Sequence, residues 1–491
     1  MTTSHKSLAH RQILARLVAA AFSISLLVST NADADGQRAL FGSELEFTNK
    51  EIDKASNRSP STSNTPTAVE YKNRFKKIVM ETCKNCTAKS TRDCYGAPIW
   101  KISYPNGFWF EITTDPHTLE IKTKPSTAKQ LKKEAPRMQR DIFDVAHKLG
   151  TVAKYEESSA AHMHIGTKSA FGNNAMLLRN FLVDYSNHPA LAGGALHKDY
   201  ANAPPIARLS PEQVKAFASA TAPSKVAKMS IEQFASTLQE RVFHRTVEAD
   251  FAPAKKYQAT SVQRIDGAMK TTGWTAEMRA MPSHESAASF VRMAELLSAR
   301  ISFLEKDGKP VQFKPQRVGS LSAKDKVNQF FQYVAESGLR WGDYVPMLNH
   351  RVRATPPSMN VAMKALGGAQ SPRFVQFLSD SIDTGIYDRK AIARWVDKAA
   401  AQKTPGHKKI MAKLSAAGPA IKSFKATDTM VAMSDRKPET AKKAKRPFSK
   451  TMTARAARAR KATTPARTRT RTGTVKPRTA AKPVRTARGR M

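Results

Sequence analysis

The stretch RALFGSELEF (38–47), and above all its second half GSELEF (42–47), decides the fold that we expect for this chain. The segment has the composition of a β-strand. Glu44 and Glu46 alternate along it, so both carboxylates lie on the same face of a sheet. Two like charges side by side are unfavourable unless a cation or a polar network lies between them. Paired acids on exposed strands are common, however, so this segment alone does not define a site.

Three later segments carry polar side chains on strand-like stretches: Glu120 in DPHTLEIKTKP (115–125), His162 and His164 in AHMHIG (161–166), and Glu277 and Arg279 in TAEMRAMPS (275–283). Imidazoles suit divalent metals and phosphate oxygens, although an isolated His-x-His pair is more often a surface pair. A guanidinium beside a carboxylate can hold the carboxylate or phosphate of a ligand. The four segments together supply four acids, two histidines and an arginine, and hard cations such as Mg²⁺ need oxygen-rich clusters of this kind.

In this order, the four segments resemble the amidoligase family, which belongs to the carboxylate–amine ligase superfamily of glutamine synthetase and glutamate–cysteine ligase. In that superfamily, an early G-x-E-x-E-F strand, a later Glu strand, an H-x-H-x-G/S-like strand and a final E-x-R strand form one sheet around divalent ions and ATP. The resemblance covers residues 38–305. It implies a glutamine-synthetase-like catalytic fold with Mg²⁺ (or Mn²⁺) and ATP as cofactors.

The resemblance also implies a role for each matching residue. Five residues would be metal ligands: Glu44, Glu46, Glu120, His162 and Glu277. His164 would face the nucleotide phosphates, and Arg279 would stabilise the transferring phosphoryl group or hold the substrate carboxylate. Three residues before the last motif lie where relatives place residues that bind substrate or nucleotide: Lys256, Tyr257 and Arg264. The implied enzyme joins a small-molecule or peptide carboxylate to an amine through an acyl phosphate.

Strands and helices are interleaved along the chain without a βαβ rhythm. The segment WFEITTDPHTLEIKTKP (109–125) alternates apolar and polar residues as half-buried strands do. Helical patterns follow at 127–149, 174–187, 210–241 and 284–305. We therefore expect an α+β fold in which an antiparallel sheet is packed against helices.

Composition divides the chain into four parts: a targeting segment (1–34), the ligase-like domain (35–305), a helical region (306–435) and a disordered tail (436–491). The first domain contains the insert ASNRSPSTSNTPTA (55–68), which has almost nothing to bury and is expected to be a flexible loop. The helical region should contain helices at 324–338, 371–382 and 388–401, separated by breaks that carry Pro and Gly.

Residues 436–491 carry 20 Lys and Arg against one acid, Glu439, a net charge of +19 out of +41 for the whole chain. Their like charges repel, and few apolar residues offset the entropy of ordering, so we expect disorder. Such an arm binds polyanions by counterion release, with little sequence preference. An alternative function is therefore binding of nucleic acid or an anionic surface through this tail, on a non-catalytic ligase-like scaffold. A third hypothesis keeps the metal site for hydrolysis or simple binding.

Residues 1–34 have the layout of a secretory signal peptide. No acid precedes Asp33, a basic start leads into the apolar stretch LVAAAFSISLLVST (17–30), and Ala32-Asp33-Ala34 is a small-x-small cleavage pattern. We therefore expect export to the periplasm or medium. A mitochondrial or cytosolic location is the alternative and would suit ATP use better. No apolar run reaches the roughly 18–20 residues of a membrane span, so we expect no transmembrane domain in the mature chain.

Two further patterns limit the chemistry. Cys83, Cys86 and Cys94 lie in one stretch that lacks a fourth zinc ligand, so a loop-closing disulfide in an oxidising compartment is the simpler expectation. Neither the P-loop motif G-x-x-x-x-G-K-[ST] nor the hydrolase motif G-x-S-x-G occurs in the sequence.

Overall fold

The computed structural model describes most of the chain between residues 38 and 397. The described residues are 38–58, 65–92, 98–115, 118–153, 161–196, 203–243, 258–265, 274–281, 283–316, 321–368, 371–383, 387, 390–391, 393–395 and 397. The chain divides into two units, Met1–Phe424 and Lys425–Met491, and all described residues belong to the first. The expected targeting segment (1–34) and basic tail (436–491) lie outside the described residues.

The strand that carries GSELEF is β1 (Leu40–Thr48), and it lies inside an open sheet. The strand order is β2 (Thr87–Arg92), β3 (Pro98–Ser103), β4 (Trp109–Asp115), β5 (Thr118–Thr123), β1, β8 (Ala161–Gly166), β10 (Thr275–Met281) and β9 (Thr260–Ser261). Two short strands, β6 (Ser126–Thr127) and β7 (Val152–Ala153), also pair with β1. All ladders between the described strands are antiparallel, which confirms the expected α+β class.

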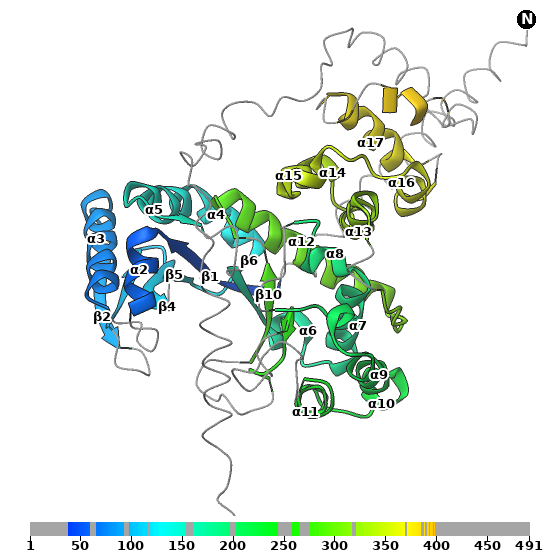
Figure 1. Ribbon diagram of the computed structural model, residues 1–491, viewed down its shortest axis with the longest axis horizontal. Coiled ribbons are helices and arrows are strands. Elements are labelled where there is room, and N and C mark those ends of the chain that lie inside the picture. Colours follow the sequence, from blue (N-terminus) through cyan, green and yellow to red (C-terminus); the bar gives the residue numbers. More distant parts are fainter. Residues whose placement is uncertain are drawn as a thin grey trace, which may run out of the picture. The chain divides into compact units, whose positions relative to one another are not determined.

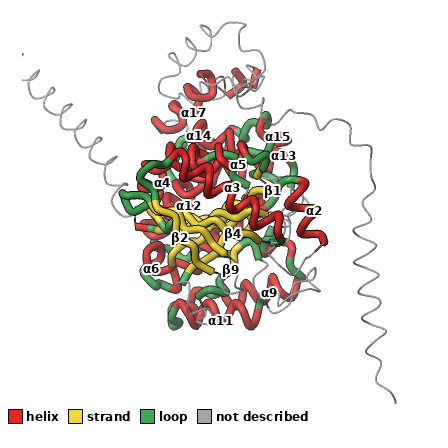
Figure 2. The backbone as a smooth tube through the Cα atoms, turned by 90° about the vertical axis from the view of Figure 1, so that its left-hand side faces the viewer, coloured by secondary structure: helices red, strands yellow, loops and turns green. Residues whose placement is uncertain are grey.

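One face of this sheet is apolar and covered by helices. Phe41, Leu45 and Phe47 of β1 alternate with the acids and are fully buried. The helices on this side are α3 (Pro66–Thr82), α4 (Ala128–Met138), the π-helical turn η3 (Gln139–Phe143), α5 (Asp144–Lys148) and α12 (Ala287–Asp307). Figures 1 and 2 show α4 and α12 along the same side of the strands.

Edge-to-face aromatic contacts fasten the helices to that face. The ring of Phe47 on β1 lies 5.7 Å from that of Phe143 in η3, and Phe75 on α3 lies 6.4 Å from Phe110 on β4. Offset and edge-to-face pairs of this kind add to the energy of apolar burial. The helices therefore take up the apolar face of the sheet, and the opposite face carries the acids and histidines.

Helices occupy both ends of the segment 55–68, which was expected to be a flexible loop. Residues up to Arg58 belong to α2 (Lys50–Arg58), whose first amides donate to the side chain of Asn49. At the other end, Thr65 caps α3 and Pro66 takes its first helical position, where the missing amide hydrogen costs nothing. Helix-starting residues at both ends thus outweigh the polar composition, and only 59–64 lie outside the described residues.

The remaining helices of the first half follow β8 in the chain, and two of them, α6 and α8, contact β8 and β10. They are α6 (Thr167–Phe171), α7 (Ala175–Asn187), α8 (Pro189–Ala192), η4 (Ile206–Arg208), α9 (Pro211–Ala220), α10 (Pro223–Val226) and α11 (Ile231–Arg241). The segment 210–241 is helical, as expected, but it is divided into α9, α10 and α11. Pro223 starts a new helix, and Ser230 caps the next one by a reciprocal capping box with Gln233.

The region after residue 306 is helical, as expected. It contains α13 (Ala323–Glu336), α14 (Trp341–Tyr344), η6 (Val345–Met347), α15 (His350–Arg353), α16 (Met359–Ala365) and α17 (Pro372–Asp383). The helix expected at 388–401 falls largely outside the described residues. None of the described helices is long and apolar enough to span a membrane.

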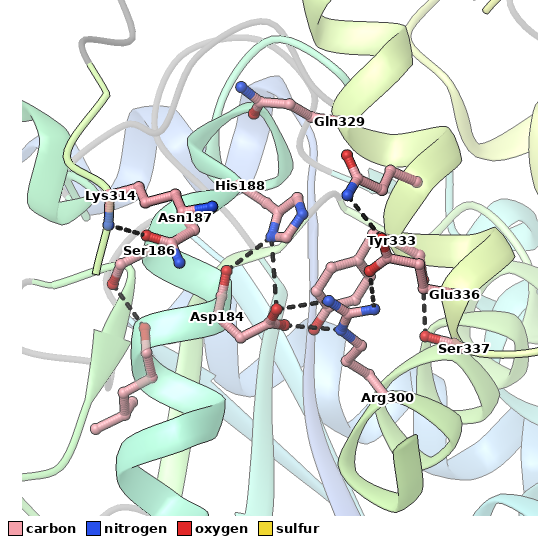
Figure 3. Close-up of polar contacts among 12 residues, drawn as sticks. Asp184, Ser186, Asn187, His188, Arg300, Lys314, Gln329, Tyr333, Glu336 and Ser337 are labelled. Atoms are coloured by element: carbon pink, nitrogen blue, oxygen red, sulfur yellow. Dashed lines mark hydrogen bonds and ion pairs between the residues drawn. The ribbon is translucent and has the colours of Figure 1, made fainter. Parts of the chain in front are cut away.

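A buried ion-pair network joins this helical region to the rest of the unit. Figure 3 shows Arg300 of α12 between Asp184 of α7 and Glu336 of α13. Arg300 binds both oxygens of Asp184 at 2.5 and 2.8 Å and reaches Glu336 at 3.0 Å. Its guanidinium also lies 4.5 Å from the ring centre of Tyr333. The expected domain boundary after 305 therefore falls in the last turn of a helix that packs on both sides.

Candidate metal centre

The pairing of the strands brings the sequence-predicted polar residues onto one face of the sheet. Three register pairs place them side by side: Glu44 with His162, Glu46 with Glu120, and Glu277 with His164; Lys122 is paired with Glu44 on the same face. Because side chains alternate between the two faces of a strand, these residues all point away from the apolar core. Segments far apart in the chain thus contribute to one polar surface.

The first group of candidate ligands comprises Glu44, His164 and Glu277. One oxygen or nitrogen from each of them lies within 4.8 Å of the others, so the three could hold one ion. His164 Nε2 is 3.3 Å from Glu44 Oε1. The Nδ1 atom on the other side of this ring lies 3.3 Å from Thr275 Oγ1, and this contact turns Nε2 toward the carboxylates.

His162 lies beside this group. Its Nδ1 is 3.1 Å from Glu44 Oε2 and 3.4 Å from Glu277 Oε1, so the ring bridges the two carboxylates. The resemblance implied that His162 is a ligand and that His164 faces the phosphates. In the structure His164 forms a three-residue group with the two carboxylates, and His162 lies against both of the same carboxylates.

The second group comprises Glu46, Asp115 and Glu120, whose ligand oxygens also lie within 4.8 Å of one another. Asp115 is the last residue of β4 and has no counterpart among the sequence-predicted residues. Period two along β4 places Asp115 on the same face as Glu111, but its approach to Glu46 and Glu120 depends on the registers of β4 with β5 and of β5 with β1.

Three cations balance these acids. Lys122 Nζ is 3.5 Å from Glu44 Oε1 and 3.1 Å from Glu120 Oε1, and sequence reasoning had not singled it out. Arg279 Nη1 is 2.6 Å from Glu277 Oε1, as the spacing of the last motif suggests. The third cation, Arg264, is described below.

Arg264 lies farther from the carboxylates than Lys122 and Arg279 do, close to the 4 Å limit of an ion pair. Its Nη2 is 3.9 Å from Glu44 Oε1 and its Nε is 4.0 Å from Glu277 Oε2. Lys256 and Tyr257, the other predicted substrate-binding residues, lie outside the described residues. Of the predicted basic residues, Arg264 and Arg279 therefore reach the first group of ligands.

Burial and neighbouring charge act in opposite directions on these carboxyl groups. Burial alone would raise the pKa of Glu44, but the rings of His162 and His164 and the ammonium of Lys122 outweigh it and hold this pKa well below its usual value. Burial would likewise raise the pKa of Glu277, and Arg279 with the two histidines lowers it. Both carboxylates of the first group are therefore ionised near neutral pH.

Glu120 shows the opposite behaviour. Burial and the negative charge of Glu44 raise its pKa well above the usual value, and Lys122 offsets only part of this. The second group is thus short of positive charge. A divalent cation bound there would supply that charge and favour the ionised form.

These donors fit a hard divalent cation. Both groups are rich in carboxylate oxygens, which suit Mg²⁺ and Mn²⁺. His164 Nε2 is buried, and among the described residues it meets no hydrogen-bond criterion, although Glu44 Oε1 lies 3.3 Å away; a nitrogen beside a carboxylate in this way can serve as a ligand. Glu44, Glu46, Glu120 and Glu277 are each less than a tenth exposed, so water does little to offset their repulsion.

Cys83 and Cys86 belong to neither ligand group. Cys83 follows the last residue of α3 and forms a disulfide with Cys86, in agreement with the expected loop closure, and Cys94 lies outside the described residues.

No known protein-family model matches the sequence, and comparison with curated proteins gives no match.

Proposed function

We propose that this protein is an ATP- and Mg²⁺-dependent carboxylate–amine ligase that forms an amide through an acyl phosphate. The observation that supports this best is the pair of neighbouring carboxylate groups on one sheet face, Glu44–His164–Glu277 and Glu46–Asp115–Glu120. The glutamates of both groups carry largely buried negative charge, which favours bound cations, and Lys122 contacts one acid of each group. The order of the four motifs that supply these residues resembles that of the amidoligases.

The reaction must bring anions together. An oxygen of the substrate carboxylate attacks the γ-phosphorus of ATP, the bond to the ADP oxygen breaks, and an acyl phosphate forms. The amine nitrogen then attacks the acyl carbon and loses a proton, and inorganic phosphate leaves with its bonding electrons. Mg²⁺ would supply charge neutralisation for the phosphates in this site.

The chain's own residues would act by charge and position. Glu44, Glu46, Asp115, Glu120, Glu277 and His164 would hold the ions. Arg279 and Arg264, on the side of the first group, would neutralise the transferring phosphoryl group or the substrate carboxylate. His162 would keep Glu44 and Glu277 in place through its contacts with both.

A trapping experiment tests this proposal without knowledge of the amine. Hydroxylamine converts an acyl phosphate to a hydroxamate, so the full-length protein is incubated with MgATP, hydroxylamine and a panel of carboxylic acids and acidic peptides. We expect hydroxamate and ADP with at least one acid, and loss of both in Glu46→Gln. Glu111→Gln serves as the control, because Glu111 pairs with Lys101 at 3.5 Å and belongs to neither ligand group. Hydrolysis of ATP without hydroxamate would instead favour a hydrolase.

The basic tail supports a second activity. Its net charge of +19 over residues 436–491 favours polyanion binding by counterion release. We expect affinity for a nucleic-acid probe to fall steeply with salt and to disappear when residues 436–491 are deleted. Glu46→Gln should leave this binding unchanged, which separates the two activities.

A further inference from the structure

Lys122 occupies an unusual place between the two ligand groups. Its Nζ lies 3.5 Å from Glu44 Oε1 in the first group and 3.1 Å from Glu120 Oε1 in the second. The sheet fixes this position, because Lys122 on β5 is directly opposite Glu44 on β1. Its side chain is 41% exposed, whereas the two carboxylates that it contacts are almost completely buried.

The acids around Lys122 need a cation. Glu46 and Glu120 are directly opposite each other in the β1–β5 ladder, and like charges at such positions repel. Glu44 lies next along the same face. Among the described lysines, Lys122 contacts one acid of the first group, Glu44, and one acid of the second group, Glu120. Its ammonium therefore lies between the negative charges of the two groups. A long, partly exposed lysine chain can also move toward solvent with little loss of packing.

We propose that Lys122 is a tethered cation that neutralises the two carboxylate groups when no metal is bound and thereby sets the affinity of the site for divalent ions. The inference rests on the proposed metal-dependent function. An incoming ion competes with the ammonium for Glu44 and Glu120, and it is also repelled by the lysine charge. Lys122 is therefore a positioning residue that keeps the site folded without metal and weakens metal binding.

A lysine with only a structural role would behave differently. Replacing a structural lysine would lower stability and would disturb the ligand groups, so metal would bind equally well or more weakly. Replacing a competing cation lowers the stability of the metal-free protein but strengthens metal binding. A like charge a few ångströms from the ion, partly screened, corresponds to on the order of tenfold in affinity. The two roles thus predict opposite changes in one measurement.

The experiment compares full-length wild type, Lys122→Gln, Lys122→Arg and Lys101→Gln. Lys101 is the matched control, because it lies on the same face and pairs with Glu111 at 3.5 Å. Mn²⁺ alone is the probe: free Mn²⁺ is followed by its paramagnetic resonance signal, and melting temperature is measured with and without the ion. We expect K122Q to melt lower without Mn²⁺, to bind Mn²⁺ about tenfold more tightly, and to gain more in melting temperature from Mn²⁺ than wild type does. K122R and K101Q should bind Mn²⁺ as wild type does.

The outcomes separate this inference from the function on which it rests. Mn²⁺ binding that is unchanged or weaker in K122Q overturns the role of Lys122 and leaves the metal site standing. Binding by K122Q but not by wild type supports the inference in its strongest form. No binding in either protein removes the metal site, and the inference falls with it.

Discussion

Replacing Arg300 with methionine should remove a large part of the protein's stability. Arg300 is 2% exposed and holds both oxygens of Asp184, itself 3% exposed, at 2.5 and 2.8 Å. Methionine fills much of the same volume but leaves the carboxylate of Asp184 buried without its guanidinium partner, with the ring of His188 3.8 Å away. Breaking a buried pair from one side costs about 3–5 kcal/mol, so we expect the free energy of unfolding of R300M to fall by that amount.

The assay is urea-induced unfolding of the full-length protein, followed by tryptophan fluorescence and circular dichroism. The control is Arg340→Met, because Arg340 pairs with Asp380 at 3.0 Å but is 63% exposed. An exposed pair contributes less than about 1 kcal/mol. In the double variant Asp184→Leu/Arg300→Met the cost should fall below the sum of the two single costs, since neither fully buried charge of the Asp184–Arg300 pair is then left without the other, although Glu336 still loses Arg300. A cost for R300M no greater than that for R340M would refute the reasoning.

Two further predictions concern stability. Burial lowers the pKa of His284 to about 3, so the folded state keeps this ring neutral while the unfolded state binds a proton below a pKa of about 6.5. The free energy of unfolding should therefore fall as pH drops from 6.5 toward 3, by up to about 1.4 kcal/mol per pH unit. In urea titrations at several pH values, His284→Gln should show a smaller dependence of stability on pH than wild type. An equal dependence in the two proteins would contradict the prediction. Gly308 caps the C-terminus of α12 with φ of 62°, a conformation that favours glycine, so Gly308→Ala should lower the free energy of unfolding by about 1 kcal/mol. Gly342 in α14 has open space around it and no positive φ, so Gly342→Ala should not destabilise the protein. Equal effects of the two alanines in thermal unfolding would argue against a backbone origin.

The site residues that could be predicted from the sequence are those whose positions follow from the two-residue period of a strand. Glu44 and Glu46 share a face because they are two residues apart, and the same holds for His162 and His164. Such spacing requires no knowledge of which strands pair. The order of the motifs then suggested that these faces meet, and the ladders of β1 with β8 and of β8 with β10 bring them together.

The residues that sequence reasoning missed depend on tertiary register. Asp115 approaches Glu46 and Glu120 only because β4, β5 and β1 pair in one particular alignment. If β5 were shifted by one residue, Lys122 would point toward the apolar, helix-covered face and away from both ligand groups, since a one-residue slip moves every side chain to the other face. Neither alignment can be read from local composition.

Helix boundaries failed for a different reason. Helices α2 and α3 extend into the segment 55–68 that was expected to be a loop. Their N-caps, Asn49 and Thr65, each stabilise a helix by about 1 kcal/mol. Pro223 divides the segment 210–241 where its apolar pattern continues. Single capping residues and prolines thus decide the ends of elements, whereas overall composition only predicts that the elements exist.

The most direct test of the central claim is calorimetric titration of ATP into the full-length protein with and without Mg²⁺. Wild type, Glu277→Gln, Glu46→Gln and the control Glu111→Gln all retain the basic tail, so nucleotide bound by that tail is the same in each. The proposed function predicts a Mg²⁺-dependent binding event in wild type and E111Q that is lost in E277Q and E46Q. Binding that is equal in all four proteins, or independent of Mg²⁺, would contradict a metal–nucleotide site on this sheet.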